Sequence, residues 1–184
     1  MIYQEGENMN IIIRKETQAD YQVTESVVKQ AFDSLEFSDQ KEHELVSRIR
    51  QSDAFIPELS LVAVLSDRIV GHILLSRITI RGDQHTVDSL ALAPVSVLPE
   101  YQALGIGEKL IRDALQLAVQ LEYSSVIVLG HPQYYPKFGF KKASIWGIQP
   151  PFEVPDEVFM ALELQEHALN HASGVVQYPS EFFE

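Results

Sequence analysis

Apolar residues recur at helical spacing in three stretches of the chain. The first follows a capping-box pattern at Thr17 and Asp20 and runs to about Phe32. The second covers residues 39–50, and the third, which has the most regular period, covers 107–122. The positions expected to face inward are Val23, Val27, Val28 and Ala31; Leu45, Val46 and Ile49; and Ile106, Leu110, Ala114, Leu117, Ala118 and Leu121.

Shorter apolar runs predict strands between and beyond these helices, at residues 11–15, 61–65, 69–80, 86–97, 126–129 and 158–164. The run 126–129 has no polar position, which is typical of a central strand buried on both faces. Strand 86–97, helix 107–122 and strand 126–129 form a βαβ unit, so the two strands should be parallel. We therefore expect an α/β fold with a mixed sheet. Residues 165–184 have no clear pattern.

The strand predicted over 86–97 contains a slip in its alternation. Leu90 and Leu92 set one face, but Val95 and Val97 have the opposite parity, and Pro94 lies between the two pairs. One extra residue in one strand defines a β-bulge, and a proline inside a ladder requires an edge, a bulge or a missing partner. We expect the strand to bend there or to separate from its neighbour. The alternative is that the strand ends at Ala93.

Composition narrows the classes of function. The chain has 184 residues, no cysteine and a formal net charge of -12, which excludes disulfides, thiolate metal sites and cysteine nucleophiles and argues against nucleic-acid binding. Its length suits one domain over 10–184, with residues 1–9 as a flexible extension. No apolar run is long enough to span a bilayer, and a cytoplasmic location is expected. The acidic charge favours a cationic or amine-bearing partner.

The clearest chemical signal is a glycine loop between a strand and a helix, formed by Gln102, Ala103, Leu104, Gly105, Ile106 and Gly107. Unpaired amides at a helix N-terminus bind anions, and glycines allow close approach of a pyrophosphate. A P-loop is excluded because Glu108 follows Gly107, and a dinucleotide fingerprint lacks its third small residue because that position is Leu110. A coenzyme A loop and a glycine turn without a ligand both stay open.

Two motifs together resemble one family. Residues 95–107 (Val-Ser-Val-Leu-Pro-Glu-Tyr-Gln-Ala-Leu-Gly-Ile-Gly) resemble the acetyl-CoA signature of the GNAT superfamily of N-acetyltransferases. Residues 134–140 (Tyr-Tyr-Pro-Lys-Phe-Gly-Phe) resemble its later aromatic element, and 129–140 with 150–152 are similar to the YhbS-like branch. The resemblance covers nearly the whole chain from Asn10 onward. It implies a GNAT-like fold whose central parallel strands splay apart to admit the pantetheine arm.

The resemblance also implies an activity and site residues. The cosubstrate would be acetyl-CoA, and its acetyl group would pass directly to a primary amine of a small molecule or protein. The amides of 102–107 would bind the pyrophosphate, and the main chain of Val95 and Val97 would meet pantetheine, with the amide of Val97 or Leu98 polarising the thioester oxygen. Tyr135 would be the general acid that protonates the departing thiolate. Packing at a helix end is the other interpretation of Tyr135.

The base is less well marked. His131 follows the buried strand, where a βαβ sheet presents ligands, and is a candidate base or substrate contact. It also suits a turn, in which it would only cap. Glu36, Asp39 and Glu42 fall in the segment that resembles the acceptor-binding region, although a solvated acidic face is the interpretation that we favour for them. Acceptor specificity is expected in loops 32–39 and 146–154.

Several questions stay open at this level. The other histidines have no metal-ligand spacing, so we predict no metal. A non-catalytic acyl-CoA sensor and an acyltransferase that uses another acyl-CoA are the competing functions. The acceptor and the oligomeric state, monomer or homodimer, are not predicted.

Overall fold

The computed structural model describes residues 9–36 and 38–184. The prediction for the N-terminal extension therefore lies almost entirely outside the described residues. In the described part, a nine-stranded mixed sheet has the order β1-β2-β3-β4-β5-β8-β6, and β9 pairs with β3 and β7. The strands are β1 (Ile12–Lys15), β2 (Ser60–Leu65), β3 (Arg68–Arg81), β4 (Thr86–Val97), β5 (Ser125–Leu129), β6 (Lys141–Lys142), β7 (Ile148–Gln149), β8 (Phe159–Glu163) and β9 (Gly174–Gln177).

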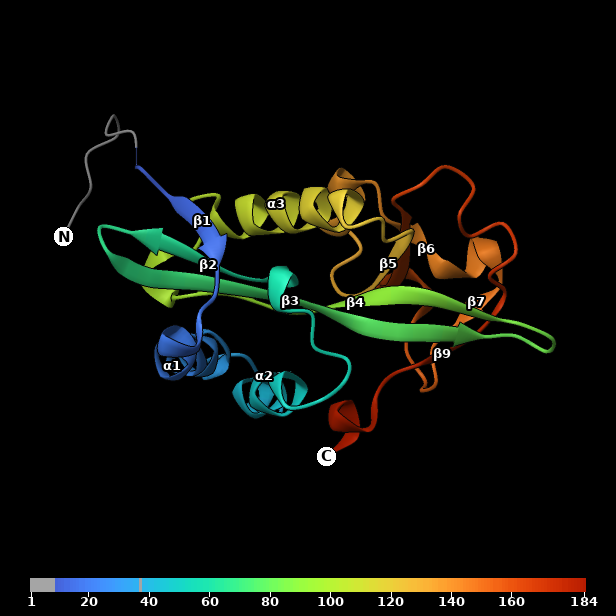
Figure 1. Cartoon of the computed structure of the whole chain (residues 1–184), viewed down its shortest axis with the longest axis horizontal. Coiled ribbons are helices and arrows are strands. Elements are labelled where there is room, and N and C mark those ends of the chain that lie inside the picture. The colour runs from blue at the N-terminus through green and yellow to red at the C-terminus, as the bar shows by residue number, and fades with distance from the viewer. Residues whose placement is uncertain (1–8, 37) are drawn as a thin grey trace.

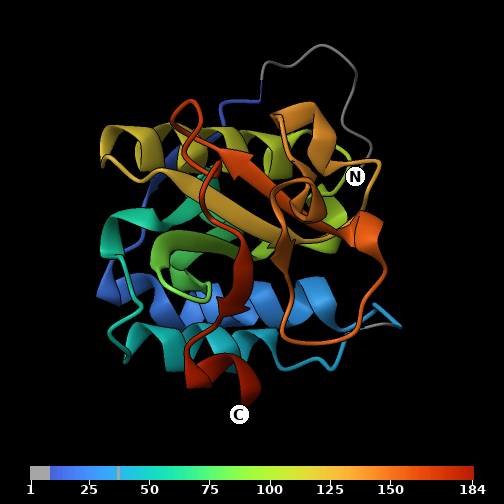
Figure 2. The same cartoon turned by 90° about the vertical axis from the view of Figure 1, so that its right-hand side faces the viewer.

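Helices cover both faces of this sheet (Figure 1). Helices α1 (Tyr21–Phe32) and α2 (Glu42–Arg50) lie side by side on one face, and α3 (Ile106–Gln120) lies on the other. Figure 2 shows the same three layers from the end of the molecule. The largest apolar core fills the layer beneath α3, and a smaller one, with Val28, Val46, Ile49 and Leu74, fills the layer beneath α1 and α2. The predicted α/β class and mixed sheet are confirmed.

Three details of the helices differ from the prediction. Leu121, expected to face inward, is 40% exposed, because α3 ends at Gln120 and Leu121 is its C-cap. Thr24, Val27, Val28 and Ala31 form the buried stripe of α1, whereas Val23 is 49% exposed because it lies one position off that i, i+3, i+4, i+7 series. Helix α2 begins at Glu42 rather than Asp39. The cause is a turn in which Gln40 has φ 61° and the Asp39 carboxylate accepts from the Lys41 amide.

The predicted bulge in β4 is confirmed. Ile73 pairs with Val95 and Leu75 pairs with Leu92, so two residues of β4, Ala93 and Pro94, lie opposite one residue of β3. The strand continues to Val97 instead of ending at Ala93. The parity slip in the sequence therefore marks the position of the bulge.

The central parallel strands separate at the same place. Strands β4 and β5 pair only at Leu90–Val126 and Ala91–Ile127. Beyond Ala91, β4 bends along β3, while β5 keeps its pairing with β8 as far as Leu129. The result is the splayed pair of central strands that the family resemblance implies, and it opens at the bulge.

The C-terminal residues form structure that their sequence did not predict. Strand β9 pairs with the end of β3, at 79–81, where β2 has already ended. The chain then makes a short turn at Ser180–Phe183 that lies beside α2 (Figure 2). Among the described residues, no helix is long and apolar enough to cross a membrane.

Candidate active site

The glycine loop presents a row of free amides at the start of α3. Within the described residues, the N–H groups of Ala103 through Gly107 donate to no protein acceptor. Gln102 differs from the prediction, because its amide donates to the Pro99 carbonyl at 3.3 Å. The free amides sit at the positive end of a 15-residue helix. This arrangement fits a diphosphate, because several amides and the helix dipole converge on one anion without requiring a basic cluster.

Backbone conformation explains why the loop has small residues. Gly105 is the N-cap of α3 with φ 81°, and a Cβ built there would meet no atom within 4 Å. Ala103 also has a positive φ, of 62°. The left-handed conformation costs a non-glycine residue about 1–2 kcal/mol. Open space in front of Gly105 leaves room for a ligand against the backbone.

The peptide groups of Val95 and Val97 are directed away from β3. The Leu98 amide donates to the Val70 carbonyl at 2.9 Å, and in an antiparallel ladder the peptide groups of successive residues alternate between the two sides. Val97 and Val95 therefore turn their N–H and C=O groups toward the opening between β4 and β5. The Gln102 side chain reaches Val97 O from that side at 3.1 Å. The Leu98 amide is engaged in the sheet, which leaves Val97 as the available amide of the two candidates.

Tyr135 lies in the short 3-10 turn that follows β5. Its side chain is only 7% exposed and packs against Tyr134 and Phe140, with ring centroids 5.2 and 5.7 Å away. Gly130 makes room for it, because a Cβ there would lie 2.2 Å from the Tyr135 ring. Burial raises the pKa of Tyr135 to about 12, and Tyr134 adds a smaller effect. The phenol therefore stays protonated at neutral pH.

Tyr134, the residue before the proposed general acid, borders the glycine loop. Its hydroxyl lies 3.6 Å from the position that a Cβ on Gly107 would take, and a methyl group of Val97 lies 3.8 Å from that position. Burial raises the pKa of Tyr134, so this phenol is also neutral. The structure thus brings a hydroxyl, the loop and the end of β4 together.

His131 occupies the turn between β5 and the two tyrosines. Its side chain is exposed, and its carbonyl accepts from the amides of Tyr134 and Tyr135 at 3.1 and 3.3 Å. The backbone of His131 therefore caps the turn, while the imidazole is open to solvent. Both interpretations made from the sequence are compatible with this position.

An ion-pair cluster fastens the tyrosine turn to α3. Glu108 accepts from Lys137 and from Arg112, each at 2.9 Å, and the two cations lower the pKa of the Glu108 carboxyl. The Lys137 ammonium also lies 4.2 Å from the centre of the Tyr134 ring. All three charges are exposed, so their effect on stability is small and their role is to orient the turn.

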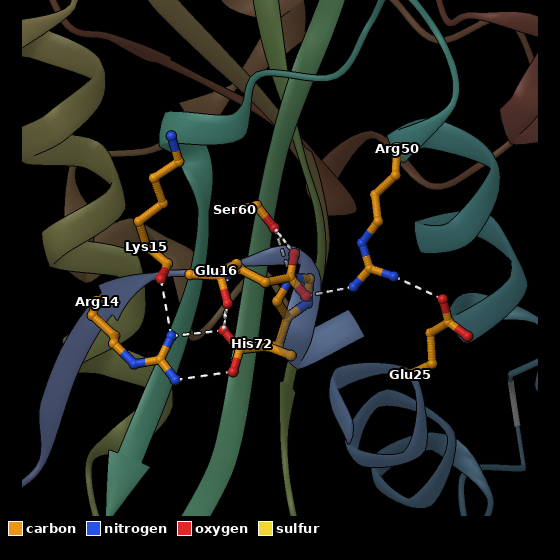
Figure 3. Close-up of polar contacts among 9 residues, drawn as sticks. Arg14, Lys15, Glu16, Glu25, Arg50, Ser60 and His72 are labelled. Carbon is orange, nitrogen blue, oxygen red and sulfur yellow. Dashed lines mark hydrogen bonds and ion pairs between the residues drawn. The ribbon is translucent and has the colours of Figure 1, made fainter. Parts of the chain in front are cut away.

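A second polar cluster, which the sequence reasoning missed, lies beneath α1 and α2 (Figure 3). The Glu16 carboxylate accepts hydrogen bonds from the Arg50 guanidinium at 2.5 Å and from the Ser60 hydroxyl at 2.6 Å. Ser60 Oγ also lies 3.1 Å from His72 Nε2. Because the single Ser60 proton goes to Glu16, His72 Nε2 must carry a proton of its own. Arg50 also binds Glu25 of α1 at 2.7 Å. His72 pairs with Ser96, between Val95 and Val97, so the cluster underlies the candidate site.

Comparisons with known proteins agree with this geometry. A family model described as the acetyltransferase (GNAT) family matches residues 24–140. The chain is 38% identical to the uncharacterized N-acetyltransferase YjhQ of Escherichia coli K12 over 122 residues, which are 66% of this chain and 67% of YjhQ. It is 26% identical to the uncharacterized N-acetyltransferase YhbS of the same strain over 173 residues, 94% of this chain and 98% of YhbS.

Solved structures extend the likeness to the fold. The crystal structure of E. coli YhbS in complex with CoA superposes with a TM-score of 0.86 and 24% identity, over 99% of this chain and 97% of YhbS. A GNAT family acetyltransferase from Brucella melitensis in complex with acetyl-CoA has a TM-score of 0.78 and 33% identity, over 95% of this chain and 99% of that protein. With a family model that spans more than half of its length and homology to YhbS along nearly all of it, the chain belongs to the GNAT family of acetyltransferases.

Proposed function

We propose that this chain transfers the acetyl group of acetyl-CoA directly to a primary amine of a small molecule or protein. The single observation that supports this most is the combination of free amides at 103–107 with the opening at the bulge of β4. The free amides suit a diphosphate, and the opening at the bulge suits the extended pantetheine arm, which needs hydrogen bonds to a strand edge. The complexes of the YhbS and Brucella proteins with CoA and acetyl-CoA add support.

The residues divide the chemistry between them. The amides of Ala103 to Gly107 hold the diphosphate, and the peptide groups of Val95 and Val97 align the arm along β4. When bound, acetyl-CoA supplies an electrophilic thioester carbon. The Val97 amide donates to the thioester oxygen, where negative charge develops. The amine forms a C–N bond as the C–S bond breaks, and the products are the N-acetylated amine and the free thiol of CoA.

Two protons must move for this balance. The acceptor loses a proton from its nitrogen, and the departing sulfur gains one. We propose Tyr135 as the donor to sulfur, since its neutral phenol is retained at neutral pH. A pKa of about 12 keeps the phenol neutral, so it still holds the proton that the sulfur takes up as the C–S bond breaks. His131, with its exposed imidazole, is the proposed acceptor of the amine proton, directly or through water.

One observation favours a second candidate function. Tyr135 is 7% exposed, which limits its access to a substrate. A non-catalytic sensor of acyl-CoA would use the loop and the strand opening without needing this phenol. A chain that uses another acyl-CoA would differ only in the acyl pocket.

Thiol release separates these candidates. The protein is incubated with acetyl-, propionyl- or succinyl-CoA and a mixed panel of amines, and free thiol is measured against reactions without protein. The proposal predicts amine-dependent release with acetyl-CoA as the best donor. Binding of acetyl-CoA without release for any amine would favour the sensor, and faster release from a larger donor would favour the third candidate.

A further inference from the structure

An apolar cavity of about 240 Å³ lies where the central strands separate. Ala91, Leu92 and Ala93 of β4 form one wall, and Ile127 and Leu129 of β5 form another. The last paired position, Ala91–Ile127, lies at its edge. The cavity is therefore continuous with the opening that the thioester arm would enter, and it is placed to hold the other substrate.

Aromatic side chains from the C-terminal half complete the cavity. Phe152 stacks on Tyr178 with ring centroids 6.0 Å apart, and Tyr178 contacts Phe182 and Phe183 at 5.0 and 6.3 Å. The C-terminal turn is held in place because the Arg48 side chain of α2 donates to the Glu181 carbonyl at 3.1 Å. Phe152 lies in the loop 146–154, where acceptor specificity was expected, whereas the contribution of Tyr178, Phe182 and Phe183 was not predicted, because residues 165–184 have no clear pattern.

Several apolar side chains of this wall are left open to solvent. Leu129, Phe152 and Phe183 are 47%, 36% and 63% exposed, and all three converge on the same cavity. Large apolar side chains that gather around one hollow mark a binding surface, whereas scattered ones do not. An apolar occupant would remove this surface from water.

Charge decides which part of an acceptor can occupy the cavity. Among the described residues that line it, none is charged, although the chain as a whole has a net charge of -12. A cationic group placed there would lose its hydration and meet no carboxylate, and the faces of the aromatic rings would replace only part of that hydration. The general preference for cationic partners that the net charge suggests therefore does not extend to this cavity.

We propose that the acceptor is a primary amine with a compact, uncharged apolar body, either an aryl group or a branched alkyl group. The body fills the cavity against Phe152, Tyr178 and the C-terminal turn, and the nitrogen lies at the opening between β4 and β5. A cavity of about 150 Å³ accommodates benzene, so the volume here suits one ring with a short linker. This inference rests on the proposed acetyl transfer and names its substrate class.

A graded series of amines tests the proposal. For primary alkylamines of increasing length and for phenyl-terminated amines, kcat/KM should rise about fourfold per added methylene until the cavity is full. The matched probes are diamines with the same number of carbons, whose second ammonium meets no carboxylate in the cavity, and a lysine-containing peptide. Both should react at least tenfold more slowly than the phenyl-terminated amine.

Variants locate the effect in the cavity. Phe183→Ala and Phe152→Ala remove exposed rings and should not prevent folding, and Ile145→Ala removes a side chain that is 60% exposed and does not line the cavity. The two Phe variants should weaken calorimetric binding of the N-acetylated phenyl-terminated product about tenfold and leave the Kd for CoA unchanged. The Ile145 variant should match the wild type in both measurements.

The outcomes distinguish this inference from the proposed function. Thiol release that is faster with diamines or the lysine peptide than with apolar amines overturns the inference and leaves acetyl transfer intact. The inference is also overturned if the Phe variants bind the product as tightly as the wild type, or if sedimentation shows a wild-type dimer that Phe152→Ala and Phe183→Ala dissociate. Absence of both CoA binding and thiol release with every amine would overturn the proposed function, and the inference with it.

Discussion

At the scale of single residues, the central question concerns two adjacent tyrosines with different surroundings. Tyr135 is buried over Gly130, and Tyr134 reaches the N-terminus of α3 beside Gly107. The family motif pointed only to Tyr135. A sequence motif identifies a position in the chain, but it does not show which groups surround the hydroxyl of either tyrosine. The location of Tyr134 depends on the packing of a turn against a helix nearly thirty residues earlier in the chain, and no local signal in the sequence contains it.

Tyr135→Phe should lower kcat about 100-fold, because it removes the proposed proton donor and keeps the ring that packs over Gly130. The Kd for acetyl-CoA, measured by calorimetry, should stay within about twofold of the wild type. Tyr134→Phe is the matched control, and it should alter the Kd more than kcat. The assignment would be reversed if Tyr134→Phe abolished turnover while Tyr135→Phe did not.

At the scale of elements, the first turn of α3 combines a structural role with the proposed role in binding the diphosphate. Its apolar stripe was predictable from spacing, and so was the presence of a glycine loop ahead of it. The free amides follow from the geometry of any helix start. The direction of the Val95 and Val97 peptide groups could be inferred only once the pairing of Leu98 with Val70 was known.

Gly107→Ala separates these two roles of α3. Alanine is the better helix former, so the free energy of unfolding should be unchanged or higher by up to about 1 kcal/mol. The added methyl group would lie in contact with Tyr134 and Val97 and narrow the approach to the amides. The Kd for CoA should rise about tenfold. Equal affinity in the two proteins would argue against this loop as the anion site.

The buried cluster joins α1, α2, β2 and β3 to the loop that follows β1, and no local pattern in the sequence marks its members. Glu16 and Arg50 are 34 residues apart, and both are charged residue types that usually lie on the surface of a protein. Their side chains are 0% and 4% exposed. Such a pair cannot be predicted from periodicity, because it depends on which helix ends meet beneath the sheet.

Arg50→Met should lower the free energy of unfolding by about 3–5 kcal/mol, since it leaves the Glu16 carboxylate buried without its cation. Urea denaturation measures the loss. Arg14→Met, which breaks the more exposed pair with Asp20, is the control and should cost less than about 1 kcal/mol. If both variants lost the same small amount, the buried pair would have no special role in the fold.

At the scale of the whole molecule, His72 links stability to pH. Burial lowers the pKa of His72 to about 4, with Glu16 opposing this effect and Arg50 adding to it. The unfolded chain therefore binds a proton near pH 6.5 that the folded chain binds only near pH 4. The contribution of neutral His72 to the free energy of unfolding is therefore fully present above about pH 6.5, and it is lost as the pH falls from 6.5 to 4.

The loss between pH 6.5 and 4 should reach about 3 kcal/mol, from the size of the shift. His72→Gln keeps an N–H donor for Ser60 and removes the titrating group. The number of protons taken up on unfolding in this window, given by the slope of the unfolding free energy against pH, should therefore be smaller by about one in the variant. Asp20, whose pKa is lowered by its hydrogen bonds with Arg14, acts separately, because its contribution is lost only below about pH 4. An identical pH dependence in wild type and variant would contradict this account of His72.

The whole fold was largely predictable where local pattern was strong. The positions of β1 to β5 and β8, the parity slip at Pro94 and the βαβ unit followed from the sequence, whereas β6, β7 and β9 did not. The splayed strands followed from the resemblance. The C-terminal aromatic wall did not, because Tyr178, Phe182 and Phe183 show neither strand nor helix periodicity. Their role arises from the docking of the last turn on α2, which is a tertiary contact.

The most direct test of the account is a calorimetric titration of the wild-type protein with CoA and, separately, with pantetheine, which lacks the diphosphate. If the amides at the start of α3 bind the diphosphate, titration with CoA should give a measurable heat of binding at protein concentrations well below about 1 mM. Pantetheine should bind much more weakly. No heat with CoA at about 1 mM, or equal affinity for the two compounds, would contradict the claim that residues 103–107 hold the diphosphate.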